Sequence, residues 1–259
     1  MNLQLENKTA LVTGSTKGIG FAIARLLAEE GATVIVNGRS KDSTDAAAHK
    51  IGGKARGVAA NISTAAGCAE LVRHAPEVDI LVNNAGIFEP KPFTEIPDAD
   101  WERFYQVNVM SGVRLTRAYL PHMLTRNWGR VIFMSSESGV QIPEEMIHYG
   151  MTKAAELALV NGIARLTKKT GVTVNAVLPG PTASEGVTDF VNQLATSAKQ
   201  TPEEFEKEFF RNVRPTSLLQ RFATVDEVAN MVAYLCSPLA SATNGAAVRV
   251  DGGVVRSTV

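Results

Sequence analysis

The sequence predicts an α/β fold, in which a doubly wound parallel β-sheet carries helices on both of its faces. Three observations lead to this prediction. Short apolar strand patterns alternate with helical patterns along all 259 residues. The connections between strands are long enough to hold a helix, so successive strands are expected to run parallel. The first strand pattern also leads directly into a glycine-rich turn and then a helix. Because the alternation has no break, residues 1–259 are expected to form a single domain.

Seven strands are expected in chain order, each a short apolar run between turn residues. They are predicted near residues 8–13, 32–37, 55–60, 79–83, 130–135, 172–178 and 246–250. The helix expected after the sixth strand and a long connection has the clearest start, because Thr224 and Glu227 have capping-box spacing ahead of an apolar face. We expect this helix to be scaffold.

The turn after the first strand is the first candidate binding element. Glycine lets the chain bend sharply there and approach a ligand without Cβ atoms in the way. The helix that follows presents free N–H groups and the positive end of its dipole, which favour a pyrophosphate. The alternative is an ordinary strand-to-helix turn. The candidate residues are Gly14, Ser15, Thr16, Lys17, Gly18, Ile19 and Gly20.

Tyr149 and Lys153 are candidate catalytic residues because their spacing puts both on one face of a predicted helix. A free phenol has a pKa of about 10, and a neighbouring ammonium stabilises the phenolate and lowers that pKa. Such a tyrosine can transfer protons near neutral pH. In isolation, an aromatic residue and a lysine on one helix face are more often structural, so the pair needs polar neighbours.

Ser136 and Asn108 are the polar neighbours that the sequence offers. Ser136 directly follows the strand expected at 130–135, and a hydroxyl at the carboxyl end of a parallel strand points into the crevice where such sheets bind ligands. It could hydrogen-bond a substrate carbonyl, or it could be a turn serine that satisfies local backbone. Asn108 could likewise only satisfy buried backbone groups.

Together these residues resemble the classical short-chain dehydrogenase/reductase family over nearly the whole chain, and its 3-oxoacyl-[acyl-carrier-protein] reductases most. The glycine turn looks like the cofactor motif of that family. Asn83-Asn84-Ala85-Gly86 looks like the signature after its fourth strand, and Pro179-Gly180 agrees with the segment after its sixth. The resemblance implies a Rossmann-type fold, a nicotinamide cofactor and a homotetramer.

The same resemblance implies roles for single residues. Tyr149 would donate or accept the proton, Lys153 would lower its pKa and bind the nicotinamide ribose, Ser136 would hold the carbonyl, and Asn108 would support a water relay. Further cofactor contacts are implied for residues at the ends of the later strands, with Ser184 where the family often has threonine. These are Asn61, Ile62, Asn84, Ala85, Gly86, Pro179, Gly180, Thr182 and Ser184.

The end of the second strand predicts NADP(H) rather than NAD(H). A carboxylate there would bind the ribose 2′-hydroxyl and repel a 2′-phosphate. This chain has Gly38 and then Arg39, whose guanidinium is suited to phosphate oxygens, with Lys17 as a second cation. The alternative for Arg39 is a solvated loop charge. On the adenine side, the family usually has an aspartate where this chain has Asn61, so that contact lacks a charge.

The composition argues against several classes of protein. The 26 basic and 26 acidic residues balance, so neither a nucleic-acid surface nor a polybasic membrane contact is expected. Cys68 and Cys236 are too few for a disulfide framework or a zinc site, and no metal site is predicted. The sequence has neither a secretory signal pattern nor an apolar run of ~18 residues. We therefore expect a soluble, cytoplasmic protein.

Residues 183–219 are the least regular stretch, and we expect them to form a substrate lid. Phe205, Phe209 and Phe210 have helical spacing, so a lid helix could turn aromatic side chains towards the pocket. Such residues more often serve packing. The stretch is longer than the compact loops of typical 3-oxoacyl carrier-protein reductases.

The predicted function is NADP(H)-dependent hydride transfer between the nicotinamide and the carbonyl or secondary alcohol of a small-molecule substrate. A ketone or 3-oxoacyl reductase is expected first. A sugar or polyol dehydrogenase of the same family is the alternative, and a non-catalytic NADP(H)-sensing protein is a third reading. The complete set of Asn108, Ser136, Tyr149 and Lys153 argues against a protein that only binds the cofactor.

Overall fold

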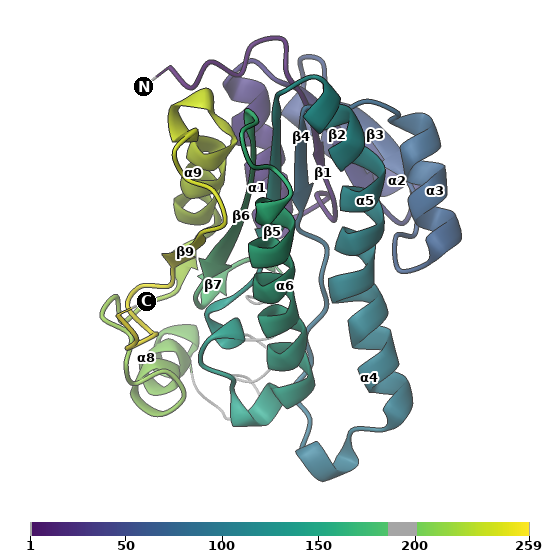
Figure 1. The fold of residues 1–259 in the computed structure, drawn as a ribbon. Coiled ribbons are helices and arrows are strands. Elements are labelled where there is room, and N and C mark those ends of the chain that lie inside the picture. The colour runs from purple at the N-terminus through teal and green to yellow at the C-terminus, as the bar shows by residue number, and fades with distance from the viewer. Residues whose placement is uncertain (1, 186–200, 259) are drawn as a thin grey trace.

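The computed structural model describes residues 2–185 and 201–258 (Figure 1). Seven parallel strands form one sheet, in the order β3-β2-β1-β4-β5-β6-β9. They are β1 Thr9–Val12, β2 Thr33–Gly38, β3 Arg56–Ala59, β4 Ile80–Asn83, β5 Gly129–Met134, β6 Val172–Pro179 and β9 Ala247–Val250. All seven predicted strands are thereby confirmed. The order reverses between β1 and β4, which makes the sheet doubly wound and opens a crevice at the carboxyl ends of these strands.

The helices connect these strands or extend beyond them. The α-helices are α1 Gly18–Glu29, α2 Lys41–Ile51, α3 Ala65–His74, α4 Asp98–Phe104, α5 Ser111–Thr125, α6 Ile147–Arg165, α8 Pro202–Asn212 and α9 Val225–Cys236. Shorter turns are η1 Phe93–Glu95, the π-helical η2 Tyr105–Met110, η3 Glu137–Gly139, η4 Glu144–Met146 and η5 Pro238–Ala240. Two short strands, β7 Thr182–Ala183 and β8 Ala223–Thr224, pair separately from the main sheet.

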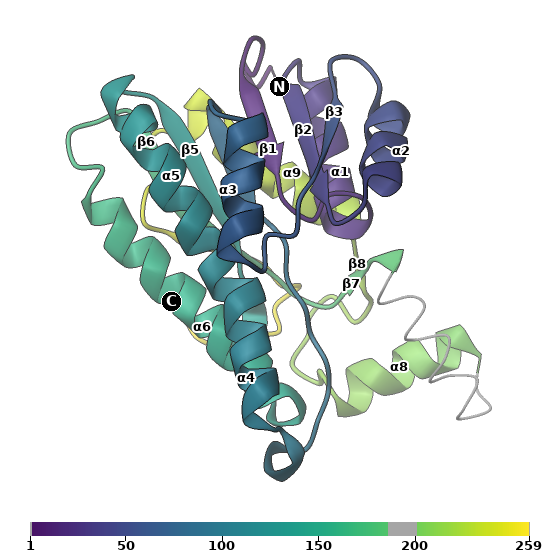
Figure 2. The same cartoon turned by 90° about the vertical axis from the view of Figure 1, so that its right-hand side faces the viewer.

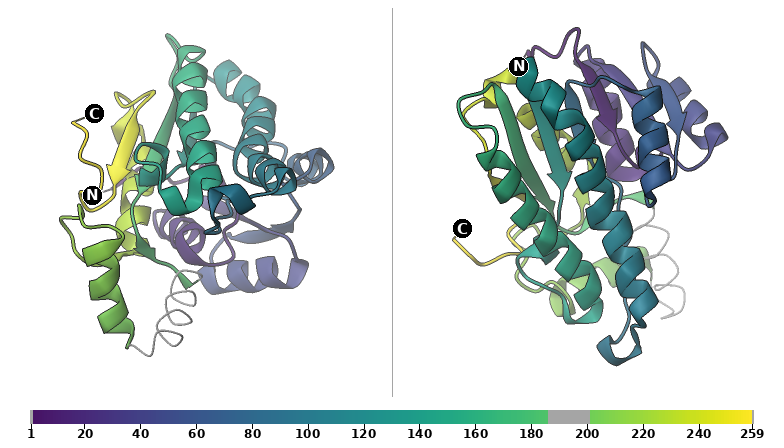
Figure 3. Two further views of the ribbon diagram at one scale, coloured as in Figure 1. Left: turned by 90° about the horizontal axis from the view of Figure 1, so that it is seen from below. Right: turned by 45° about the vertical axis from the view of Figure 1, so that its right-hand side comes forward.

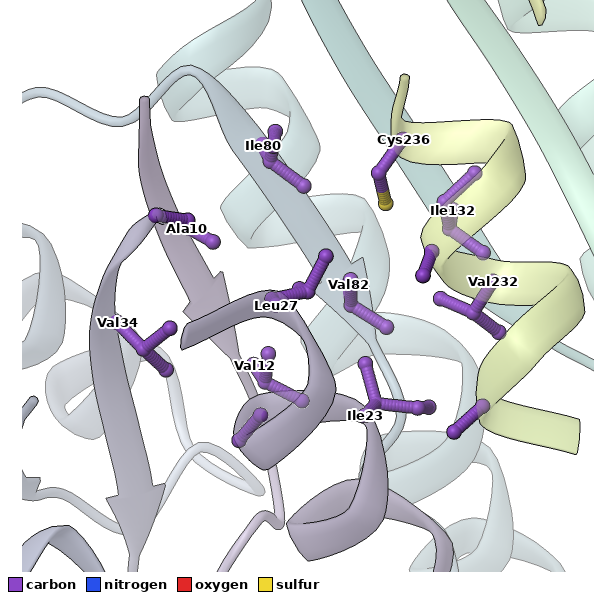
Figure 4. Packing of buried hydrophobic residues seen from close by; sticks show 14 of the residues in the cluster. Ala10, Val12, Ile23, Leu27, Val34, Ile80, Val82, Ile132, Val232 and Cys236 are labelled. Atoms are coloured by element: carbon purple, nitrogen blue, oxygen red, sulfur yellow. The ribbon is translucent and has the colours of Figure 1, made fainter. Parts of the chain in front are cut away.

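The strands are apolar nearly throughout because both faces of the sheet are covered. On one face, α1, α2 and α9 pack on alternate residues such as Val12, Val34 and Ile132 (Figure 4). On the other face, α3, α5 and α6 pack on the residues between them, such as Leu11 and Phe133. The expected scaffold role of α9 is confirmed by this packing, and its predicted capping box between Thr224 and Glu227 is present.

The carboxyl ends of the strands lead to the part of the molecule that holds the candidate site. In Figures 1 and 2, α8 lies beyond these ends, next to β7 and β8, and the lower end of α6 extends past the sheet. The right-hand view of Figure 3 shows α4 below α5 in one long helical column beside α6. The stretch where a lid was predicted contains the helix α8, which begins with a capping box between Thr201 and Glu204. Residues 186–200 of the expected lid lie outside the described residues.

Two exclusions made from the sequence can be compared with the described residues. Cys68 and Cys236 are both buried and both free, so they form no disulfide. No helix among the described residues is long and apolar enough to cross a membrane.

Candidate active site

The glycine turn forms a tight cradle between β1 and α1. Gly14 and Gly18 have φ of +61° and +60°, in the left-handed region that favours glycine. A Cβ on Gly20 would lie 2.4 Å from the Asn84 amide nitrogen and 2.5 Å from the Gly14 carbonyl oxygen. Glycine is therefore required at these positions by backbone conformation and by space.

Asn84 and Thr13 hold this turn in place. The Asn84 side-chain amide donates to the carbonyl oxygens of Thr13 and Gly14, at 2.9 and 3.1 Å. The Thr13 hydroxyl accepts from the backbone N–H groups of Asn84 and Ala85. Ser15 is fully buried, and its hydroxyl donates to Val12 and accepts from Asn37 N–H. These hydrogen bonds fix the shape of the cradle, and Asn84 also lines a cavity next to it.

The start of α1 suits an anion. Its N-cap residue, Lys17, makes no side-chain capping bond, and the first turn holds no acidic residue. The Gly18 N–H instead donates to a carboxylate oxygen of Glu185 at 3.1 Å. A carboxylate at this N–H stands where the phosphates of a dinucleotide would bind. The cradle, together with a helix start whose N–H already binds a carboxylate, therefore fits a nicotinamide dinucleotide.

The remaining candidate cofactor residues extend from this cradle in two directions. Arg39 and Lys17 are exposed, and neither makes a side-chain hydrogen bond or ion pair with the described residues. Ile62 is buried, whereas Asn61 is exposed and its amide oxygen accepts from the Ser63 N–H and hydroxyl. That oxygen, which the sequence assigns to adenine, already has two donors.

On the nicotinamide side, the residues after β6 come close to the glycine turn. The Gly180 N–H donates to Val250, and the buried Thr182 hydroxyl donates to Gly180. A Cβ on Gly18 would be 3.3 Å from the Ser184 Cβ, so the two segments face each other. Pro179, Gly180, Thr182 and Ser184 all line the same cavity as Ile19.

That cavity, about 580 Å³ in volume, brings the predicted catalytic residues together. Ser136 follows β5, and Tyr149 and Lys153 lie on α6; all three line it. Burial raises the pKa of the Tyr149 phenol, and its hydrogen bond with Ser136 lowers it in part. The charges of Glu137 and Glu156 raise this pKa further, while Arg214 lowers it. The surroundings thus act against the lowered pKa that the sequence predicted.

The Lys153 ammonium is paired with groups other than the Tyr149 phenol. Nζ donates to the Met134 carbonyl at 2.7 Å and to both carboxylate oxygens of Glu156 at 3.2 Å. The side chains of Lys153 and Glu156 are only 5% and 2% exposed, so this is a buried ion pair. Nζ lies 5.7 Å from the centre of the Tyr149 ring. Burial raises the pKa of Glu156 to about 7, and its contact with Lys153 lowers it in part.

Asn108 lies in the π-helical η2 and is buried behind the cavity. Its amide oxygen accepts from the Ile87 N–H at 2.8 Å, and its amide nitrogen donates to the Ile87 carbonyl and the Thr152 hydroxyl. It therefore ties the segment after β4 to α6. A Cβ on Gly86 would lie 3.5 Å from the Asn108 oxygen and 3.6 Å from Lys153 Nζ, so this glycine keeps the space between them open.

Three charged residues that the sequence analysis did not single out form one corner of the cavity. The Ser136 and Ser138 hydroxyls donate to the same Glu137 oxygen, at 2.5 and 2.6 Å. Arg214, which follows α8, donates to the other Glu137 oxygen and to Glu145, each at 3.1 Å. We refer to Glu137, Glu145 and Arg214 as the charged corner.

Helix α8 supplies apolar walls to the cavity next to the charged corner, since the Arg214 guanidinium lies 6.0 Å from the centre of the Phe209 ring. Phe205 and Phe209 line the cavity, whereas Phe210 is 1% exposed and packs edge to face on Phe222. Packing is the role that the sequence favours for all three phenylalanines, and two of them also line the cavity.

The charged residues of the site that were not predicted from the sequence differ in whether a local pattern could have identified them. Glu156 lies three residues after Lys153, and that helical spacing could have revealed the pair. Glu137 directly follows Ser136. Arg214 contacts Glu137 across 77 positions of sequence, and no local pattern predicts that contact.

Residues 8–195 match the family model of short chain dehydrogenases, and the chain belongs to that family. It is 50% identical to the uncharacterized oxidoreductase YvaG of Bacillus subtilis, over 99% of each protein. It is 36% identical to the 3-oxoacyl-[acyl-carrier-protein] reductase FabG of Aquifex aeolicus, covering 98% of this chain and 100% of that one. The crystal structure of L-sorbose reductase from Gluconobacter frateurii, complexed with NADPH and L-sorbose, superposes with a TM-score of 0.94 at 30% identity, covering 99% and 100% of the two chains.

Proposed function

We propose that this short-chain dehydrogenase is an NADP(H)-dependent reductase of a ketone or 3-oxoacyl carbonyl, which it interconverts with a secondary alcohol. The observation that carries the proposal is the meeting of a phenol, a hydroxyl and an ammonium at one cavity that also borders the glycine turn. Tyr149, Ser136 and Lys153 all line this cavity, together with Ile19 of the turn. The 36% identity to a 3-oxoacyl reductase supports the same reaction class.

The cofactor would be held by the cradle of Gly14, Gly18 and Gly20, by the start of α1, and by the segments after β4 and β6. When bound, it would supply or take the hydride. Arg39 and Lys17 would contact the 2′-phosphate, because both cations are exposed at that end and make no side-chain bond within the described residues. The NADPH-bound neighbour supports this preference.

The chain itself contributes the proton and the alignment of the substrate. Burial raises the pKa of the Tyr149 phenol, so the phenol carries its proton at neutral pH, as a donor to a carbonyl oxygen requires. Ser136 has one hydroxyl hydrogen, and Glu137 accepts it. To hold a substrate carbonyl, this hydroxyl must turn away from Glu137, which keeps its bonds to Ser138 and Arg214. Lys153 stays fixed between Met134 and Glu156, with Asn108 behind it.

A sugar or polyol dehydrogenase is a second candidate, and the charged corner is the observation that favours it. Carboxylate and guanidinium groups beside Ser136 offer acceptors and donors for substrate hydroxyls. The neighbour complexed with L-sorbose supports this alternative.

The deciding experiment follows the oxidation of NADPH and of NADH with a panel of 3-oxoacyl thioesters, diketones, simple ketones and keto-sugars. We expect turnover with at least one class, and a clear preference for NADPH. Comparable efficiency with NADH would contradict the cofactor assignment. Tight NADPH binding with no turnover in either direction would favour the cofactor-sensing alternative.

The predicted cytoplasmic homotetramer also remains a proposal. The resemblance to the family supports the tetramer. Exposed apolar side chains such as Leu166 and Leu239, at 66% and 43% exposure, also support an assembly of several copies. Light scattering of the purified protein would give the mass of the assembly, and a monomer would contradict the proposal.

A further inference from the structure

Arg214 holds the charged corner together and retains unused hydrogen-bonding capacity. Its Nε donates to Glu137, and its Nη1 donates to Glu145 and to the Val213 carbonyl. Its Nη2 donates no hydrogen bond to any residue that the structure describes. The side chain is 11% exposed and lines the cavity. A substrate oxygen is therefore the natural acceptor for this remaining donor.

The formal charge around this donor is negative. Glu137 and Glu145 together outweigh the one guanidinium that bridges them. The nearest other cation that lines the cavity, Lys153, is already neutralised by Glu156. Phe88, Met146 and Phe209 line the remaining wall. Little water reaches the Glu137 side chain, which is 6% exposed, whereas the Glu145 side chain is 37% exposed and partly screened.

The remaining donor of Arg214 and the negative charge around it distinguish neutral substrate oxygens from anionic ones. A substrate carboxylate would compete with Glu137 and Glu145 for the same guanidinium and would add a third negative charge to the corner. A hydroxyl or a second carbonyl would accept from Nη2 without adding charge. The arrangement therefore offers a bond to a neutral oxygen and opposes an anionic one.

We propose that the charged corner makes this enzyme selective for uncharged carbonyl substrates, with Arg214 donating to a neutral oxygen beside the reacting carbonyl and Glu145 repelling carboxylates. This inference depends on the proposed function, because it concerns the substrate of that same reaction. It narrows the substrate class to compounds such as 3-oxo esters and thioesters, diketones or hydroxyketones.

Matched pairs of neutral and anionic compounds test the selectivity. Pyruvate, acetoacetate and levulinate place a carboxylate at increasing distance from the ketone, and the methyl ester of each replaces this charge with a neutral group that is one methyl larger. We expect kcat/KM with NADPH to favour the ester by about tenfold or more in at least one pair. If no pair is turned over, the six compounds are compared as competitive inhibitors of the enzyme, assayed with the substrate that the wider panel identifies.

Glu145→Gln identifies the charge responsible, because it keeps the size of the side chain and removes its charge. The preference for the ester should fall about tenfold in this variant. Glu144→Gln is the matched control: this neighbouring carboxylate is exposed and does not line the cavity. In the control, the ratio of ester to acid should equal that of the wild type.

The outcomes separate this inference from the proposed function. If no carbonyl compound is reduced, the proposed function fails. If carbonyls are reduced but the acids are used or bound as well as their esters, the proposed function stands and the selectivity is wrong. Equal ratios in Glu145→Gln and Glu144→Gln would show that Glu145 is not its cause.

Discussion

The glycine turn, on the proposed cofactor side, and the charged corner, on the proposed substrate side, border the cavity that Tyr149 lines, and they are held in different ways. The turn is fixed by local backbone conformation and by neutral hydrogen bonds from Asn84 and Thr13. The charged corner is fixed by ion pairs between residues that are 77 and 69 positions apart in the chain. A cofactor site shared within the family can be built from short motifs, whereas the substrate site depends on contacts from distant segments. Changes on one side should therefore leave the other side's binding intact.

The largest expected effect is at the residue where the two sides meet. Tyr149→Phe removes the proton donor and should lower kcat by about 10²–10⁴-fold, because general acid catalysis contributes that much. The dissociation constant for NADPH, measured by fluorescence titration, should stay close to that of the wild type. Tyr234→Phe, on the exposed side of α9, is the matched control. Retention of a substantial part of the wild-type rate in Tyr149→Phe would overturn the assignment of the donor.

Gly20→Ala should weaken the cofactor side selectively. Its Cβ would meet the Asn84 amide at 2.4 Å, and such overpacking costs about 1–3 kcal/mol. We expect NADPH to bind about tenfold to a hundredfold more weakly. Gly162→Ala on α6 is the control, because a Cβ there has nothing within 4 Å. Equal NADPH affinity in the two folded variants would show that the cradle does not need glycine.

Arg39→Ala tests the cofactor preference without disturbing the cradle. A charge-assisted bond to phosphate contributes about 1.5–3 kcal/mol, so NADPH should bind about tenfold or more weakly. NADH lacks the 2′-phosphate, and its affinity should not change. The two dissociation constants, measured side by side, provide the check. An equal loss for both cofactors would mean that Arg39 acts on the fold or on a shared part of the dinucleotide.

Phe205→Ala should affect only the substrate side. The variant removes part of the apolar cavity wall and should raise the KM of the preferred substrate by about tenfold, the effect of losing ~1.4 kcal/mol of contact. NADPH affinity should be unchanged. The exposed Phe93, which does not line the cavity, gives the control variant Phe93→Ala. A large loss of NADPH affinity in Phe205→Ala would show that the two sides are coupled.

The smallest expected effect concerns the pH dependence of alcohol oxidation, which needs the phenolate. Ionised Glu156 raises the pKa of Tyr149, so Glu156→Gln should lower it and move the rise of oxidation rate to lower pH. The groups facing the phenol, namely Glu137, Arg214, Ser136 and Lys153, remain in place. Rates measured from pH 6 to 10 give the profile. An unchanged profile, or one moved to higher pH, would contradict this role.

Features fixed by a few neighbouring residues could be predicted from the sequence, whereas features that depend on contacts between distant segments could not. The seven strands, the capped α9 and the glycine cradle follow from hydrophobic patterns and conformational demands that act over a few residues. The sequence predicted a lowered pKa for Tyr149, whereas burial raises it, and the charges of Glu137 and Glu156 add to this effect. Arg214 follows α8 and lines the cavity because of the way the chain folds around this helix. No short sequence motif predicts that arrangement.

The central claim is that this chain transfers hydride between NADP(H) and a carbonyl carbon. The most direct test uses NADPH deuterated at C4 on one face or the other, with the best carbonyl substrate, and locates the label in the product by mass spectrometry and NMR. Hydride transfer from one face of the nicotinamide should put one deuterium on the carbinol carbon from only one of the two labelled cofactors. An alcohol without label from both cofactors, or no alcohol from any carbonyl substrate, would contradict it.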